Sequence, residues 1–406
     1  MDKLAIYGGN PARSHILPYG RQWIDEADID QVVQVLRGDF LTQGPHIAQF
    51  EQNVAHKANA KFAVAFCNGT AALHGATYAA GMGPGDEVIT SAITFVASAN
   101  CVLYQQGKPV FVDIDLDTFL IDFDDLQRKV TAKTKAIIPV DFTGQPIDMR
   151  KFQDFANDNG LVMIQDAAHS LGASFNGEVV GSVADMTMFS FHPVKPVTTG
   201  EGGVIVTNHE HFYRRLVQFR THGITREANN FIYESEGPWY YEMQALGYNY
   251  RLTDLQAALG SSQMHKLDQF VSLRQDIAAQ YNASFAEMEE AGLMYRPKIQ
   301  LQAISGWHLY MLRLNLSNLK ADRRLIFEAL RAENIGVNVH YAPVYLQPYY
   351  RSLGYQPGLC PIAEEAYNGL ITLPLFPQMN KNDVESVVHA VCKVLYHFSK
   401  KRNAKL

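Results

Sequence analysis

Residues 162–170 read Val-Met-Ile-Gln-Asp-Ala-Ala-His-Ser, an apolar run that ends in Asp166 and continues to His169. A short run rich in Val and Ile is typical of a strand buried on both faces of a sheet. Similar runs occupy residues 62–66, 88–90, 110–112, 136–140, 186–189 and 204–206. The segments between them carry helical spacing. This alternation predicts an α/β fold whose mostly parallel, seven-stranded sheet is covered by helices.

The rest of the chain departs from this alternation. Residues 1–22 are interrupted by Gly and Pro and predict an irregular N-terminal arm. Residues 221–251 are rich in Gly, Asn and aromatic residues and predict no regular element, and a helical pattern then covers about 254–288. We therefore expect a large domain at residues 23–255 and a smaller C-terminal α/β domain at residues 256–406.

Composition narrows the class of protein. The 406 residues are 47% hydrophobic and 19% charged, which is ordinary for a globular chain. The net charge of −6, with a basic tract only at residues 400–402, argues against nucleic acid as a partner. No apolar stretch is long enough for a membrane span or a signal peptide, and the four cysteines form no CxxC pair. A cytoplasmic protein is expected.

One short segment has the pattern of an anion site. Residues 68–73, Asn-Gly-Thr-Ala-Ala-Leu, follow a predicted strand and open a predicted helix. The free N–H groups and positive dipole end of such a helix bind phosphate well, although a simple turn capped by Asn68 or Thr70 would look the same. The glycines at 81–85 precede a strand and include Pro84, so they do not form a dinucleotide fingerprint. No GxxxxGK[ST] motif is present.

Two further segments carry ionisable groups. Asp166 ends a predicted parallel strand, where α/β proteins place their ligands, although it could also cap the next helix. No third ligand accompanies Asp166 and His169, so no metal is expected. Residues 187–196, Thr-Met-Phe-Ser-Phe-His-Pro-Val-Lys-Pro, bring Ser190 and then Lys195. A lysine enclosed in an uncharged segment has a lowered pKa and becomes a nucleophile, whereas a solvated loop lysine does not.

The three segments together match the needs of pyridoxal 5′-phosphate. This cofactor requires a phosphate cup, a lysine that binds its aldehyde, and a carboxylate beside its ring nitrogen. The chain supplies candidates for all three on one predicted sheet. Pyridoxal 5′-phosphate is therefore the expected cofactor.

With these motifs the chain resembles a known family, the fold type I, PLP-dependent nucleotide-sugar aminotransferases of the DegT/DnrJ/StrS type. The likeness runs from residues 41–44 to 339–343 and is most specific at 190–195, 200–203 and 166–169. Within the family it is closest to the pseudaminic acid pathway enzymes that aminate C4 of a UDP-linked 4-keto-6-deoxy-hexose. Residues 308–310, His-Leu-Tyr, contribute to that finer likeness.

The resemblance implies a role for individual residues. Lys195 would bind the cofactor covalently and carry the proton during transfer, and Asp166 would pair with the ring nitrogen. The remaining implied contacts are His169 at the ring hydroxyl, Thr70, Ala71 and Ser190 at the phosphate, Phe95 over the ring face, Asn249 at the phosphate of the neighbouring subunit in a homodimer, and Tyr19, Thr42 and His340 at the nucleotide sugar.

The expected activity moves an amino group from an amino acid, with glutamate as the expected donor, to C4 of the keto-sugar. One alternative is a PLP-dependent keto-sugar dehydratase, but in those relatives a histidine replaces the lysine. A non-catalytic regulatory protein on the same fold would be expected to lose Lys195 or Asp166. A nicotinamide enzyme would need the missing fingerprint. The presence of Lys195 and Asp166 favours the aminotransferase.

Overall fold

A seven-stranded sheet lies at the centre of the molecule in this computed structural model, which describes residues 3–400. Its order is β1-β9-β8-β5-β4-β2-β3. The strands are β1 (Phe62–Phe66), β2 (Glu87–Ser91), β3 (Lys108–Val112), β4 (Thr134–Ile138), β5 (Val162–Asp166), β8 (Met186–Ser190) and β9 (Gly203–Thr207). Pairing is parallel from β3 to β8, and β9 is antiparallel to both of its neighbours. The α/β fold and the mostly parallel sheet are confirmed.

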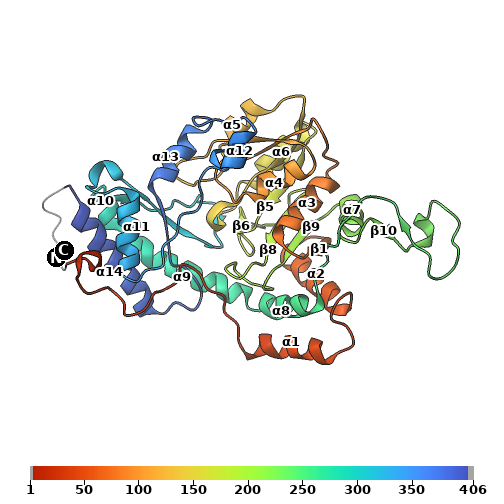
Figure 1. Ribbon diagram of the computed structural model, residues 1–406, viewed down its shortest axis with the longest axis horizontal. Helices are drawn as coiled ribbons and strands as arrows, with labels where there is room; N and C mark the ends of the chain where they lie inside the picture. The colour runs from red at the N-terminus through yellow and green to blue at the C-terminus, as the bar shows by residue number, and fades with distance from the viewer. Residues whose placement is uncertain (1–2, 401–406) are drawn as a thin grey trace.

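Helices cover both faces of this sheet (Figure 1). They are α2 (Pro45–Lys57), α3 (Gly69–Ala79), α4 (Ala97–Tyr104), α5 (Phe123–Lys129), α6 (Met149–Asp158) and α7 (Glu210–Arg220). Successive residues of β5 enter different cores, since Met163 packs in a cluster with Phe50 and Phe152 whereas Ile164 packs with Leu73 and Leu216. This burial on both faces explains the continuous apolar runs of the sequence.

The helix after the N-terminal arm is held against the large sheet domain by a later helix. Helix α1 (Glu26–Arg37) begins at Asp25, whose carboxylate accepts a hydrogen bond from the Asp28 N–H in a capping box. It packs on α8 (Asp254–Met264), as Figure 1 shows. The long helical pattern expected at 254–288 is divided into α8, α9 (Leu267–Ser284) and α10 (Ala286–Glu290).

A second core lies beyond α9. It contains the sheet β12-β14-β15, formed by Met294–Tyr295, Tyr310–Leu314 and Leu370–Leu373, together with α11 (Arg323–Ala332) and α14 (Lys381–Phe398). Leu4 and Leu17 of the N-terminal arm pack into this core, whereas Tyr345 and Tyr350 pack with the large sheet. The domain limits expected from the sequence stay a prediction. Packing crosses them at both of these places, and also where α8, which lies mostly beyond residue 255, packs on α1 and α2.

Smaller elements complete the chain. A second three-stranded sheet, β13-β6-β7, joins Ala303–Ile304, Ser174–Phe175 and Glu178–Val179. The short helices are η1 (Ala5–Tyr7), η2 (Phe142–Gly144), η3 (Ala228–Asn230), η4 (Leu316–Asn318), η5 (Val344–Leu346), α12 (Pro348–Ser352) and α13 (Pro361–Gly369). Within residues 3–400, none of the helices has the length and apolar character that a membrane crossing requires.

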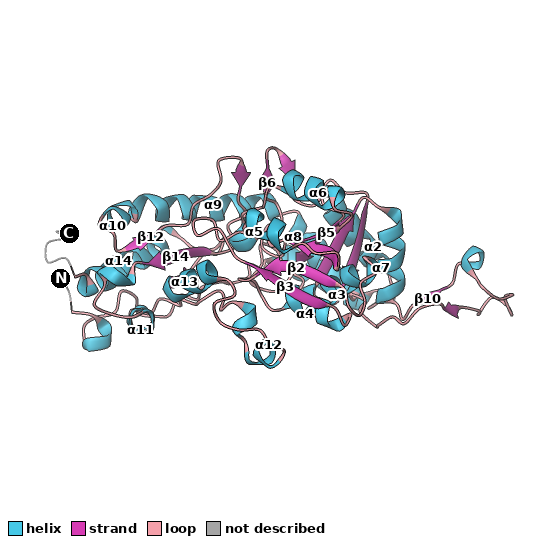
Figure 2. Cartoon of the chain, turned by 90° about the horizontal axis from the view of Figure 1, so that it is seen from above, coloured by secondary structure: helices cyan, strands magenta, loops and turns pink. Residues whose placement is uncertain are grey.

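A narrow arm projects from the body beyond α7 (Figures 1 and 2). It contains the two-stranded pair β10 (Ile224–Thr225) and β11 (Glu242–Met243). Ile232, Tyr233 and Trp239 are each at least 70% exposed on it. These residues leave apolar surface exposed on the protruding segment.

Candidate active site

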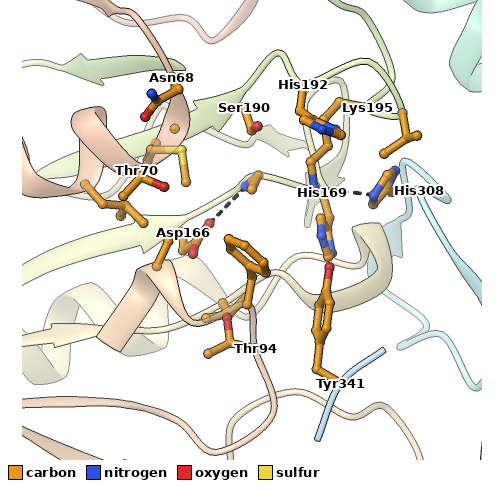
Figure 3. Close-up of a pocket in the computed structure, with 18 of the residues that line it drawn as sticks. Asn68, Thr70, Thr94, Asp166, His169, Ser190, His192, Lys195, His308 and Tyr341 are labelled. Atoms are coloured by element: carbon orange, nitrogen blue, oxygen red, sulfur yellow. Dashed lines mark hydrogen bonds between the residues drawn. The ribbon is translucent and has the colours of Figure 1, made fainter. Parts of the chain in front are cut away.

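A cavity of about 830 Å³ lies at the carboxyl ends of β5 and β8, beside the start of α3. Ligands of α/β proteins bind at this edge of a sheet. Nine of the residues expected from the sequence line this one cavity, namely Tyr19, Thr70, Ala71, Phe95, Asp166, His169, Ser190, Lys195 and His340. Figure 3 shows Thr70 on one side of it and Lys195 with His308 on the other.

Asp166, the last residue of β5, is 4% exposed. Its Oδ2 accepts a hydrogen bond from the Ser98 hydroxyl at 2.6 Å, and its Oδ1 accepts one from the Ala168 N–H at 3.2 Å. Burial raises the pKa of this carboxyl, while the two hydrogen bonds oppose that rise. The site therefore holds a buried carboxyl group, and a cationic ligand atom beside it would favour the carboxylate form.

Lys195 faces Asp166 within the same cavity, in the loop that follows β8. Its Nζ lies 3.4 Å from Nε2 of His308. Burial lowers the pKa of the amine to about 8, and the positive charge of Arg274 acts in the same direction. At pH 7.5 about a quarter of such amines are neutral, against about 0.1% for a solvated lysine. The nucleophilic role expected for Lys195 stays a prediction, and its place in the cavity is compatible with that role.

The start of α3 forms the other end of the cavity. Asn68 caps the helix, since its Oδ1 accepts a hydrogen bond from the Ala71 N–H at 2.8 Å. The N–H groups of Gly69 and Thr70 precede any possible intrahelical acceptor, so they remain for a ligand together with the Ser190 hydroxyl. Gly203 makes this close packing possible, because a Cβ there would lie 2.5 Å from the carbonyl oxygen of Asn68.

Four histidines line the cavity, and three of them, His169, His308 and His340, are buried. The rings of His169 and His308 lie 4.4 Å apart, and burial lowers the pKa of each well below its ordinary value. His340 Nδ1 lies 2.8 Å from the Thr372 hydroxyl, and burial lowers its pKa to about 4. All three are therefore neutral at physiological pH. In the described residues, Nδ1 of His169 and Nδ1 of His308 have no hydrogen-bond partner.

Aromatic rings form the open side. Phe95 is 55% exposed although it lines the cavity, and its ring lies 5.9 Å from that of Tyr341. An apolar side chain left open to a cavity in this way can stack on a planar ligand. Tyr19 reaches the cavity from the N-terminal arm and lies 5.3 Å from the ring of His340.

Two of the expected site residues do not line this cavity. Asn249 is exposed at the base of the arm and forms a β-bridge with Thr221. Its neighbour Tyr250 does reach the cavity. Thr42 is also exposed, in the loop before α2. The roles implied for Asn249 and Thr42 stay predictions. Asn249 would act at the site of a second chain, and Thr42 would act on a bound nucleotide sugar.

Sequence reasoning did not identify Ser98, Tyr341 or His308 as site residues. Ser98 lies three residues after Phe95, and Tyr341 lies next to His340. Their closeness in sequence to expected site residues was therefore the one signal that could have identified them. His308 contributed only to the family likeness. Its contact with Lys195 joins residues 113 positions apart, which no local pattern reveals.

The comparisons with known proteins agree with this site. The DegT/DnrJ/EryC1/StrS aminotransferase family matches residues 22–392. The chain is also 39% identical to the spore coat polysaccharide biosynthesis protein SpsC of Bacillus subtilis, over 93% of this chain and 97% of that protein. The chain belongs to the DegT/DnrJ/EryC1/StrS aminotransferase family.

Solved structures support the same assignment. Helicobacter pylori PseC, an aminotransferase involved in the biosynthesis of pseudaminic acid, superimposes with a TM-score of 0.87 at 30% identity, covering 94% of this chain and all of that one. The putative sugar aminotransferase Spr1654 of Streptococcus pneumoniae, in its PLP form, gives a TM-score of 0.85 at 30% identity, covering 94% and 99%. The chain is a PLP-dependent sugar aminotransferase.

The residues present fit pyridoxal 5′-phosphate. The cavity has a partly enclosed amine at one end and free first-turn N–H groups at the other, with a buried carboxyl between them in the lining. The unpartnered Nδ1 of buried His169 lies in the same lining and lacks only a ligand atom to bond. These four polar features of the cavity thus each have a matching group on the cofactor.

Proposed function

We propose that this enzyme transfers an amino group from glutamate to C4 of a UDP-linked 4-keto-6-deoxy-hexose. The observation that carries the proposal is Lys195, an amine with a pKa near 8 that shares a cavity with the buried carboxyl of Asp166. The likeness to PseC over its whole length supports the choice of substrate. A keto-sugar dehydratase is not favoured, because that activity uses a histidine in place of this lysine.

Bound pyridoxal 5′-phosphate supplies an electron-accepting ring that stabilises negative charge at the carbon losing its proton. In our proposal Lys195 would hold the cofactor through Nζ, and during amino transfer its amine would take up and return a proton at Nζ. A pKa near 8 suits both directions of this transfer, since neither protonation state of Nζ is strongly favoured near neutral pH.

The other residues would hold and orient the cofactor. Asp166 would accept a hydrogen bond from the protonated ring nitrogen, and its carboxylate would keep that proton in place. Thr70 and Ser190 would bind the phosphate, with Ala71 reaching it only by sharing the N–H that now bonds Asn68. His169 would bond the ring hydroxyl, and Phe95 would lie over the ring face.

The nucleotide sugar would enter from the open side, past Phe95. Tyr19 and His340 line that side, and Thr42 is proposed to contact the nucleotide from the loop before α2. Neutral His340 can either donate or accept a hydrogen bond, as sugar hydroxyl and carbonyl groups require.

We also propose that two chains form a homodimer whose active sites are shared. The exposed apolar residues of the arm support this, because a protruding loop of this length requires a packing surface. Asn249 at the base of the arm would reach the phosphate bound by the neighbouring chain. An arrangement in which each chain completes the other is isologous, about a twofold axis.

A substrate panel tests the proposed reaction. Purified enzyme loaded with cofactor is incubated with glutamate and with UDP- or dTDP-linked 4-keto-hexoses, and products are identified by mass spectrometry and NMR. We expect a 4-amino sugar from the UDP-linked 6-deoxy substrate, with one 2-oxoglutarate formed for each amine transferred. Preferential use of the dTDP sugars, or amination at another carbon, would contradict the proposed substrate.

A further inference from the structure

His308 is a buried histidine that contacts the amine of Lys195. Its side chain is 4% exposed, and its Nε2 lies 3.4 Å from Lys195 Nζ (Figure 3). Because its pKa lies well below the ordinary range, through burial first and the charge of Lys195 second, the ring carries a single proton. A neutral ring that accepts at Nε2 carries that proton on Nδ1. In that tautomer Nε2 is available as an acceptor for the lysine N–H.

The backbone around His308 is fixed to the large domain. The Gly306 N–H donates to the Gly144 carbonyl at 2.9 Å, and the Leu309 N–H donates to the Thr143 carbonyl at 3.1 Å. Gly144 has a φ of +107°, and a Cβ there would lie 2.8 Å from the backbone nitrogen of His308. A larger residue at 144 could not accept this approach, so the glycine sets how closely His308 reaches the cavity.

Arg274 of α9 holds the same backbone from the opposite side. It is 1% exposed, and its Nη1 donates to the carbonyls of Leu375 at 2.9 Å and of Trp307 and His308 at 3.4 Å each. Among the ion pairs of residues 3–400, none involves Arg274. A buried guanidinium that bonds only carbonyl oxygens carries a desolvation cost that no carboxylate offsets.

We propose that His308 is a catalytic residue that accepts a hydrogen bond from the Lys195 amine and orients it, and that Arg274 is the residue that positions His308. The inference rests on the proposed function, because it needs Lys195 to be the reacting amine. With one N–H directed to Nε2, the lone pair of Nζ is restricted to the two remaining tetrahedral positions, both of which point away from His308. The amine then takes up a proton from the side of the cavity away from His308 and samples fewer rotamers to do so.

The first test measures the amine itself in protein stripped of cofactor. The pH dependence of Lys195 acylation is followed by peptide mass spectrometry in wild type, His308→Gln and His308→Leu. An acceptor bond favours the charged amine, so its loss in His308→Leu should lower the labelling midpoint by about one pH unit. Glutamine retains an acceptor near the place of Nε2 and should keep the midpoint. An unchanged midpoint in His308→Leu would overturn the proposal.

The second test follows catalysis of proton transfer. Exchange of the glutamate α-proton with solvent should fall at least ~10-fold in His308→Leu and less than ~3-fold in His308→Gln. Equal losses in both variants would refute the acceptor role. If His308→Leu does not fold, His308→Asn is used instead, because its shorter side chain cannot bring an acceptor to the position of Nε2. Attachment of the cofactor to a residue other than Lys195 would instead contradict the proposed function. The labelling midpoint would not be affected by this, because it is measured without the cofactor.

Arg274 is tested by coupling, with Arg296→Met as the matched control. Arg296 is another arginine that bonds a backbone carbonyl, and it does not line the cavity. If Arg274 acts by positioning His308, Arg274→Met already removes the effect of His308. Adding His308→Leu to Arg274→Met should then change the rate of α-proton exchange by less than ~2-fold. Adding His308→Leu to Arg296→Met should lower the rate by the same factor as in the wild type. Additive effects in both backgrounds would reduce Arg274 to a structural residue and overturn its assigned role.

Discussion

The hydroxyl of Ser98 lies 2.6 Å from Oδ2 of Asp166, and it joins two elements that are 68 residues apart in the sequence. Ser98 belongs to α4, and its oxygen also lies 2.8 Å from the Thr94 hydroxyl. A donor at this short distance favours the charged form of a carboxyl group that burial would otherwise neutralise. Ser98 therefore supports the carboxylate that the proposed mechanism needs.

Replacement of Ser98 should change the pH dependence of the enzyme. In Ser98→Ala the pKa of Asp166 rises further, because the carboxylate loses a hydrogen-bond donor. We expect kcat to fall several-fold at pH 7 and to recover as the pH is raised, as measured by a pH–rate profile. Thr77→Val removes a buried hydroxyl from α3 outside the cavity and serves as the control. A loss in Ser98→Ala that is the same at every pH would contradict this role.

Removal of the carboxylate should affect catalysis far more than folding. We expect Asp166→Ala to lower turnover by at least ~100-fold, because the ring nitrogen would lose the anion that keeps it protonated. Thermal unfolding should stay close to that of the wild type. If turnover stays near normal, Asp166 serves only to end β5 and begin the next turn.

Subunit mixing tests the shared active site. Lys195→Ala and Asn249→Asp should each be inactive, the second because a negative charge would face the phosphate. Random exchange makes half of the dimers mixed, each with one intact site, so activity should return to about a quarter of the wild-type value. Exchange is verified by native mass spectrometry. Mixed dimers without activity, or a fully active monomer in sedimentation, would refute the shared site.

Acid should destabilise the fold through its buried histidines. His74 packs among Tyr104, Phe219 and Tyr248, and burial lowers its pKa to about 4. The unfolded chain binds a proton near pH 6.5, so stability is lost as the pH falls from 6.5 towards 4, by on the order of 2 kcal/mol at pH 5 from this group.

His74→Phe should reduce that loss in urea unfolding at pH 7.5 and pH 5, while exposed His389→Gln should leave it unchanged. An identical acid loss in His74→Phe and wild type would show that this histidine is not the source.

The sequence predicted the features that local pattern encodes. Each Val- and Ile-rich run became a strand because burial on both faces selects such residues. Asp166 was singled out because it ends a strand, and Lys195 because it follows one. Ser98, Tyr341 and His308 were not identified, because their contacts form only when α4, the loop before η5 and the segment before β14 are brought to the same edge of the sheet. Arg274 was not identified either, because a charged residue within a helical pattern is expected to face solvent.

Attachment of the cofactor to Lys195 is the central claim, and borohydride reduction tests it most directly. The purified enzyme is reduced with sodium borohydride and digested, and the modified peptide is sequenced by mass spectrometry, with Lys195→Ala as the control. We predict a single modified lysine, Lys195, loss of the visible absorption band on reduction, and no covalent label in Lys195→Ala. A label on any other lysine of the wild-type enzyme, or an undiminished covalent label in Lys195→Ala, would contradict the account.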